Sequence, residues 1–114
     1  MVDQAKVTLE SLAKMKRAGT PVTMLTAYDA SMAGVFDSAG IDCILVGDSL
    51  GNVIQGRDST VPVTVDDVAY HVECVRRGTR RAMLIGDMPF LSYCSESVAI
   101  ETARSLMQAG AEMV

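Results

Sequence analysis

The amino-acid sequence predicts an α/β fold in which parallel strands alternate with helices, and three observations lead to this class. Apolar segments of strand length alternate with amphipathic segments of helix length along the 114 residues. The segment LVGD at 45–48 recurs as LIGD at 84–87. An Ala-Gly pair stands before three of the predicted strands, at 18–19, 39–40 and 109–110. Repeated units of this kind fit either a (β/α)8 barrel or a doubly wound sheet.

The first predicted unit is a helix followed by a buried strand. Thr8 can act as the N-cap of a helix that runs to about Arg17. Gly19 and Pro21 end this helix, because glycine favours a C-cap and proline cannot continue the hydrogen bonding. Residues 22–26 are apolar enough for a buried strand. Since the helix precedes the first strand, we expect it to close the N-terminal end of a barrel.

Two further pairs of a helix and a strand follow. Asp29 can cap a second helix, and a second strand is predicted at 41–46. Residues 47–63 form a polar connection that is longer than the usual loop between a strand and a helix, which suggests a functional loop. Thr64 begins a third helix with valines at helical spacing, and the third strand is predicted at 82–85.

The last predicted elements are a helix and the beginning of a strand. Ser95 can cap a fourth helix that runs to about Gln108, and residues 112–114 have the character of a fourth strand that is just starting. A complete barrel takes roughly 250 residues. We therefore expect residues 1–114 to be the N-terminal part of a single barrel domain.

The composition excludes several classes of function. The net charge of −4 argues against a nucleic-acid partner, and the apolar stretches are too short to cross a membrane. No complete phosphate-loop, dinucleotide-binding or G-x-S-x-G motif occurs. Cys43, Cys74 and Cys94 lack C-x-x-C spacing, so we expect small buried thiols in a reducing cytoplasm. The mean hydropathy of +0.25 suggests apolar surface that another part of the protein covers.

Two aspartates are the first candidates for chemistry. Asp48 and Asp87 each follow a glycine, Gly47 or Gly86, at the end of a predicted strand. Because the carboxyl ends of neighbouring parallel strands meet at one edge, we expect the carboxylates to lie side by side. Close carboxylates repel unless a cation lies between them, and Mg²⁺ prefers oxygen ligands. The residues leave two interpretations open, a divalent metal site or a pair of caps. The glycines would allow either a special backbone conformation or close approach.

Other polar residues near these ends have two interpretations each. Ser49 can hold the carboxylate of a small acid with its hydroxyl and N–H, or it can bond to the loop backbone. Tyr28 can line a pocket or simply pack, and the single His71 is expected to be packed or solvated. A basic cluster precedes the third strand at the opposite end and is expected to be a turn or a subunit contact, with an anion site less favoured. This cluster consists of Arg76, Arg77, Arg80 and Arg81.

With these segments in view, the chain resembles the N-terminal part of the ketopantoate hydroxymethyltransferase family. The resemblance extends over nearly the whole chain in order, and the segments VGDSLG and DSTVPVT are specific. The matching segments are LTAYD at 25–29, LVGDSLG at 45–51, QG at 55–56, DSTVPVT at 58–64, AYH at 69–71, GDMPF at 86–90 and AGA at 109–111.

The resemblance implies a (β/α)8 TIM barrel of the phosphoenolpyruvate/pyruvate superfamily that forms homo-oligomers. It implies transfer of a one-carbon unit from 5,10-methylenetetrahydrofolate to 3-methyl-2-oxobutanoate, which gives 2-dehydropantoate for pantothenate biosynthesis. Asp48 and Asp87 match ligands of Mg²⁺, and Asp48, Ser49 and Asp87 match positions that contact the oxoacid. The family's Lys-x-Glu segment and its general base, a Glu, correspond to positions after Val114. We therefore expect no general base within these 114 residues and no turnover by them alone.

Two alternative functions follow from the same features. The first is a Mg²⁺-dependent lyase or mutase of the same superfamily that acts on oxoacids, although the segment at 58–64 speaks against it. The second is a non-catalytic half-barrel that assembles through its open sheet edge.

Overall fold

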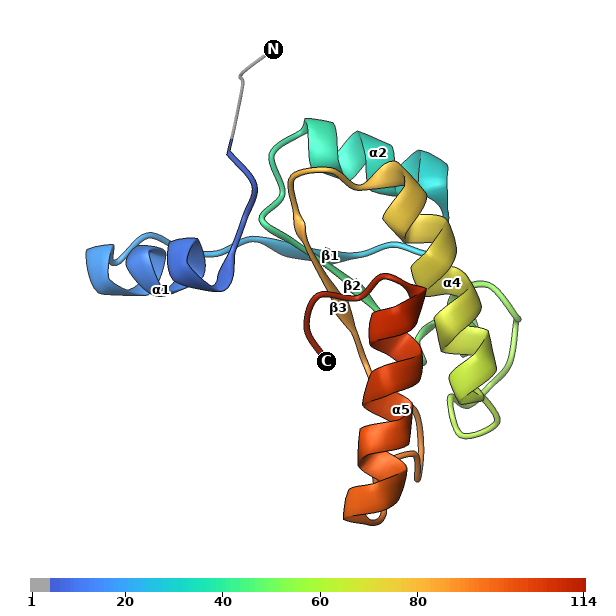
Figure 1. Ribbon diagram of the computed structural model, residues 1–114. Coiled ribbons are helices and arrows are strands. Elements are labelled where there is room, and N and C mark those ends of the chain that lie inside the picture. The colour runs from blue at the N-terminus through green and yellow to red at the C-terminus, as the bar shows by residue number, and fades with distance from the viewer. Residues whose placement is uncertain (1–4) are drawn as a thin grey trace.

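The computed structural model describes residues 5–114, and its centre is a parallel sheet of three strands (Figure 1). The strands β1 (Met24–Thr26), β2 (Cys43–Val46) and β3 (Met83–Gly86) lie in the order β1-β2-β3. Met113 forms one further parallel bridge with Ile85 of β3, where the sequence predicts a fourth strand. Neighbours in the sheet are therefore neighbours in the chain, and the predicted parallel α/β class is confirmed.

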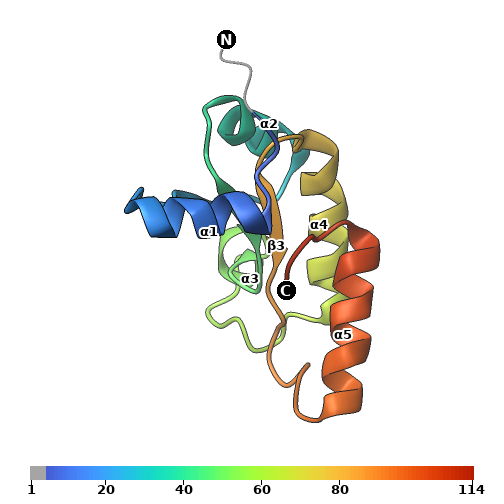
Figure 2. The ribbon, with the colours of Figure 1, turned by 60° about the vertical axis from the view of Figure 1, so that its left-hand side comes forward.

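In the described part of the chain, residues 5–114, five helices precede or follow the strands. Helices α2, α4 and α5 pack side by side, α2 against α4 and α4 against α5. Figure 2 shows α4 and α5 on one side of β3 and α1 on the other side. The bounds are Leu9–Ala18 for α1, Ala30–Ser38 for α2, Leu50–Val53 for α3, Val65–Gly78 for α4 and Glu96–Ala109 for α5.

Side-chain caps fix where the longer helices begin. The Thr8 side chain accepts from the Ser11 N–H and the Thr64 side chain from the Asp67 N–H, each within a capping box. The Asp29 carboxylate accepts from the N–H of Met32 at 2.7 Å. At the start of α5, the Ser95 side chain likewise accepts from the N–H of Val98. All four caps that the sequence predicts are confirmed.

The two faces of the sheet carry different parts of the core. Ile44, Val46 and Leu84 are fully buried in the larger cluster beneath the helices. Cys43 and Met83 alternate with them, point to the opposite face and pack with Val7. Leu12 of α1, Ile85 and Met113 complete this second cluster, which is smaller than the one beneath the helices.

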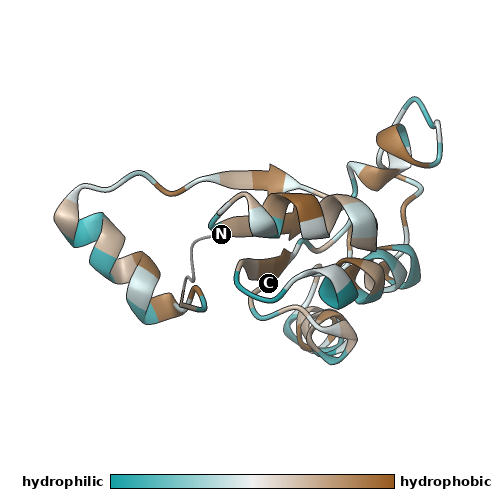
Figure 3. Ribbon diagram, turned by 90° about the horizontal axis from the view of Figure 1, so that it is seen from above, coloured by the Kyte–Doolittle hydropathy of each residue, from teal (hydrophilic) through white to brown (hydrophobic). Residues whose placement is uncertain are grey.

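The first strand differs from the prediction of a buried strand at 22–26. It spans only Met24–Thr26, and all three residues are exposed. Among the described residues β1 pairs with β2 alone and is an edge strand, and a long connection from α1 leads into it (Figure 3). Met24 is 50% exposed and Leu25 42% exposed, so the uncovered apolar surface that the mean hydropathy suggests lies partly on this strand.

Two further expectations need correction. The connection at 47–63 is not entirely irregular, because residues Leu50–Val53 form the short helix α3 directly after Ser49. Helix α1 contains no buried residue and projects from the body, so within residues 5–114 it covers the sheet only through Leu12 (Figure 1). Val7, just before it, is buried instead and donates its N–H to the Arg81 carbonyl at 2.8 Å.

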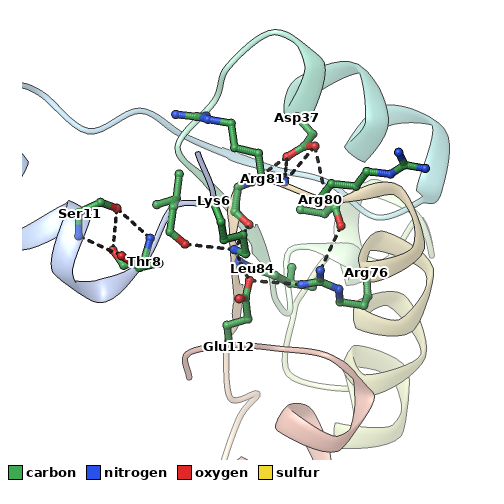
Figure 4. A network of polar contacts seen from close by, with 12 residues as sticks. Lys6, Thr8, Ser11, Asp37, Arg76, Arg80, Arg81, Leu84 and Glu112 are labelled. Atoms are coloured by element: carbon green, nitrogen blue, oxygen red, sulfur yellow. Dashed lines mark hydrogen bonds and ion pairs between the residues drawn. The ribbon is translucent and has the colours of Figure 1, made fainter. Parts of the chain in front are cut away.

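Glu112 joins three separate segments at the end of the sheet opposite the aspartates. One oxygen of its carboxylate accepts from Lys6 Nζ at 2.9 Å, from Arg76 Nη1 at 3.3 Å and from the Leu84 N–H at 3.1 Å (Figure 4). Burial opposes ionisation of Glu112, but these bonds and the charges of Lys6 and Arg76 outweigh it and lower the pKa of the carboxyl. The contact ties the segment before α1 to the segment after α5.

The basic cluster before β3 is a structured turn rather than a free cationic patch. The Asp37 carboxylate accepts from the backbone N–H groups of Arg80, Arg81 and Ala82, the last at 2.7 Å (Figure 4). The Arg81 guanidinium forms an ion pair with Asp42 at 3.4 Å. The prediction of a turn is confirmed for Arg80 and Arg81, whereas Arg76 and Arg77 belong to the last turn of α4. Within residues 5–114, no helix is long and apolar enough to cross a membrane.

Candidate functional site

The candidate site lies where β2 and β3 end, and its arrangement follows from the register of these strands. Val46 pairs with Gly86, and the Asp87 N–H donates to the Val46 carbonyl at 2.8 Å. Asp87 is therefore level with Gly47, and Asp48 lies one residue further along. The two LxGD segments are staggered by one residue, so the aspartates are diagonal neighbours rather than direct partners.

Gly47 allows the two strand ends to approach closely. A Cβ atom at Gly47 would lie 2.8 Å from the Asp87 Cβ and 3.1 Å from its Oδ2. Gly47 has no positive φ, so of the two reasons that the sequence offers for this glycine, close approach is the correct one. Gly86 allows α5 and the segment after it to approach the sheet, because a Cβ there would lie 3.4 Å from the Cβ of Leu106 and 3.2 Å from that of Ala111.

The charge of Asp48 affects the ionisation of Asp87. Burial raises the pKa of Asp87, the charge of Asp48 raises it further, and the Met88 N–H only partly offsets these effects. Asp87 nevertheless remains open to solvent on its other side, and Asp48 is half-buried. Two mutually repelling carboxylates with open oxygens are a suitable donor set for a hard divalent cation.

The structure does not give the aspartates the role of helix caps. Ser49 is the N-cap of α3, and Asp48 precedes it. Asp87 lies in the segment between β3 and α5, and the N-cap of α5 is Ser95, not Asp87. Among residues 5–114, no third His, Cys, Asp or Glu joins the pair to complete a metal-binding group. The site therefore offers two acidic ligands.

Ser49 is held by a residue from the end of β1. Its Oγ lies 2.7 Å from the hydroxyl oxygen of Tyr28, and within residues 5–114 the side chain bonds neither to the loop backbone nor to the first turn of α3. Among residues 5–114, the Ser49 N–H donates to no protein acceptor. Tyr28 is buried, as packing predicts, and His71 Nδ1 lies 2.8 Å from its carbonyl oxygen. His71 is half-buried and packed.

Sequence reasoning finds Tyr28 and Ser49 separately but misses the contact between them. The available signal is that both follow predicted strands at the same edge of the sheet. The thiols also differ from expectation. Cys43 is buried and Cys74 half-buried, but Cys94 is exposed because it lies in the segment before α5, where neither the sheet nor a helix covers it.

The fold and the site define a parallel α/β protein with an acidic site at the carboxyl ends of its strands. Comparison with known proteins specifies the family. The sequence model described as ketopantoate hydroxymethyltransferase matches residues 6–114, and the chain belongs to this family.

Curated relatives agree with this assignment. The chain is 59% identical over 110 residues to the 3-methyl-2-oxobutanoate hydroxymethyltransferase of Shewanella loihica, covering 96% of this chain and 42% of the relative. Identity to the protein of the same name from Shewanella denitrificans is 62%, with 96% of this chain and 42% of the relative covered. The Idiomarina loihiensis protein is 59% identical, with 96% and 41% covered. The chain thus spans less than half the length of these relatives.

Proposed function

We propose that these residues are the N-terminal part of a 3-methyl-2-oxobutanoate hydroxymethyltransferase. The reaction would transfer a one-carbon unit from 5,10-methylenetetrahydrofolate to 3-methyl-2-oxobutanoate and give 2-dehydropantoate, a step of pantothenate biosynthesis. The observation that carries the proposal is the acidic pair Asp48 and Asp87 beside Ser49 at one edge of the sheet. Membership of the family favours this reaction over an oxoacid lyase or mutase.

The proposal includes a (β/α)8 barrel of the phosphoenolpyruvate/pyruvate superfamily, with residues 1–114 as the N-terminal part of its single domain. Consecutive strand order supports a barrel, because a doubly wound sheet reverses its order at a switch point. The bridge at Met113 continues the same order beyond β3. The one-residue stagger between the LxGD segments also fits, since eight strands with a shear of eight advance about one residue per strand.

Asp48 and Asp87 are the proposed ligands of Mg²⁺ and, with Ser49, the proposed contacts of the oxoacid. A bound Mg²⁺ would supply positive charge to the keto and carboxylate oxygens of the substrate, which acidifies the neighbouring C–H. The chain's own contribution is to hold two carboxylates at one edge and to present the Ser49 hydroxyl and N–H to the substrate carboxylate. The proposal assigns no general base to residues 5–114.

The one-carbon donor accounts for the rest of the chemistry. Loss of a proton from C3 of the oxoacid leaves an electron pair that forms a bond to the methylene carbon of the folate. Both bonds from that carbon to the folate nitrogens break, water supplies the hydroxyl group, and the nitrogens take up the protons from C3 and from water to give tetrahydrofolate. We also propose that the protein forms a homo-oligomer in the cytoplasm. The apolar residues exposed on β1 are surface that the remainder of a barrel, or another subunit, would cover.

The test is a chimera in which residues 6–114 replace the matching part of the Shewanella loihica relative. We expect the chimera to form 2-dehydropantoate in a Mg²⁺-dependent reaction. D48N and D87N should each lower kcat/KM at least about a hundredfold, because the metal supplies several kcal/mol of stabilisation. D66N is the matched control, since Asp66 is exposed in the first turn of α4 and should leave the rate unchanged.

Calorimetric titration of the chimera with MgCl2 tests the metal site independently of the reaction. D48N and D87N should each weaken Mg²⁺ binding by the chimera, whereas D66N should not. A folded chimera without hydroxymethyl transfer would contradict the function. An active chimera that tolerates both D48N and D87N would contradict the site.

A further inference from the structure

The contact between Tyr28 and Ser49 is the polar feature of this edge that the proposed chemistry leaves unexplained. Tyr28 follows β1 and is only 9% exposed, within the core cluster beneath the helices. Its main chain is held on two sides, because the Ala27 N–H donates to the Leu45 carbonyl and His71 Nδ1 bonds to the Tyr28 carbonyl. A carbonyl oxygen only accepts, so Nδ1 carries the proton in this bond. The backbone that carries the phenol is therefore held in place.

The hydroxyl at the other end of the ring contacts Ser49, and the acidity of the two groups indicates which of them donates. The Tyr28 hydroxyl lies 2.7 Å from Ser49 Oγ, which is a short bond between two hydroxyl groups. A phenol is the stronger acid of the two, so its proton is favoured in the bond and Ser49 accepts. The serine proton is then available to another acceptor, and Asp48 directly precedes Ser49.

We propose that Tyr28 is a positioning residue that orients the Ser49 hydroxyl as a donor toward the carboxylate of the oxoacid substrate. This inference rests on the proposed function. Asp48 immediately precedes Ser49, so the hydroxyl and the acidic pair act on the same small region. The Ser49 N–H, which has no protein acceptor among residues 5–114, offers a second donor to the same carboxylate.

A purely structural role makes the opposite prediction. In that case Ser49 would only satisfy the hydroxyl of a buried tyrosine, and removing the phenol oxygen would leave the ligand unaffected. Tyr28→Phe separates the two roles, because it removes one oxygen and keeps the ring in the core. Tyr70→Phe is the matched control. Tyr70 is 61% exposed on α4, so the loss of its hydroxyl group should change neither ligand binding nor stability.

The experiment titrates the 114-residue chain with 3-methyl-2-oxobutanoate in the presence of MgCl2 and follows the Ser49 and Leu50 amides by NMR. Y28F should raise the Kd about three- to tenfold, the usual effect of one neutral hydrogen bond. The lost bond should lower the thermal midpoint by about 2–8 °C, which corresponds to about 0.5–1 kcal/mol, so the protein stays folded during the titration. In the chimera, the same substitution should raise the KM for the oxoacid by a similar factor and leave the KM for folate unchanged.

The double variant decides whether Tyr28 acts through Ser49. If the inference is correct, Y28F adds nothing to S49A, and both single variants weaken binding. Equal Kd and KM values for Y28F and the parent protein would overturn the inference while leaving the proposed function intact. An undiminished effect of Y28F in the S49A background would also overturn it. Absence of oxoacid binding by both the parent chain and the chimera would refute the proposed function, and this inference with it.

Discussion

Helices α2 and α4 cross at a pair of glycines, and substituting each glycine tests how closely the helices must approach. Gly78 is the last residue of α4, and a Cβ there would lie 2.2 Å from the Ala30 carbonyl oxygen. An ordinary contact between carbon and oxygen is about 3.3 Å, so G78A requires a displacement of roughly 1 Å. Gly34 faces the same crossing from α2, but its Cβ would meet Gly78 O at 3.8 Å, an ordinary contact.

The two substitutions should have opposite effects on stability. Overpacking costs about 1–3 kcal/mol, and replacing glycine by alanine in a helix returns about 0.5–1 kcal/mol. We therefore expect G78A to lower the free energy of unfolding by about 1–2 kcal/mol, which corresponds to a shift of the urea midpoint on the order of 0.5–1 M. G34A meets no clash and should raise the free energy of unfolding by about 0.5–1 kcal/mol.

Urea unfolding of the 114-residue chain, followed by far-UV circular dichroism, measures both values. The crossing also affects the candidate site, because α4 carries His71 and the chain just before α2 carries its partner Tyr28. G78A should therefore perturb the NMR signals of the His71 ring more than G34A does. If G78A proved as stable as G34A, the close packing of α2 on α4 would be wrong as a description of this protein.

Two further predictions concern charge and thiols. The pKa of Glu112 is lowered in the folded chain, so its stabilising effect is present above its ordinary value of 4.5 and is lost as the pH falls through the folded value. E112Q should therefore destabilise the chain at about pH 7, and the difference in urea midpoint should shrink toward about pH 3; a constant difference would contradict this. Burial, and then the charge of Asp42, raise the pKa of Cys43. Cys94 should react with maleimide well before Cys43, and equal rates in native buffer would contradict the placement of these thiols.

Local chemistry made much of the fold predictable. The hydroxyl or carboxylate of a cap acts on a backbone N–H only three residues away, so Thr8, Asp29, Thr64 and Ser95 are recognisable without tertiary information. The approximate strand positions and the parallel class follow from the alternation of apolar, strand-length segments with amphipathic, helix-length segments. The candidate aspartates were also predictable, because residues directly after parallel strands gather at one edge whatever the details of packing.

The order of the elements, the caps, the acidic edge and the resemblance to a family can therefore be inferred from the amino-acid sequence. The one-residue stagger of Asp48 and Asp87, the exposure of β1 and Cys94, and the bond between Tyr28 and Ser49 become visible only in the folded chain. These features depend on how segments distant in the chain are placed against each other. Side-chain periodicity shows that a strand has two faces, but the packing of the other segments decides which face is covered and which hydroxyl finds a partner.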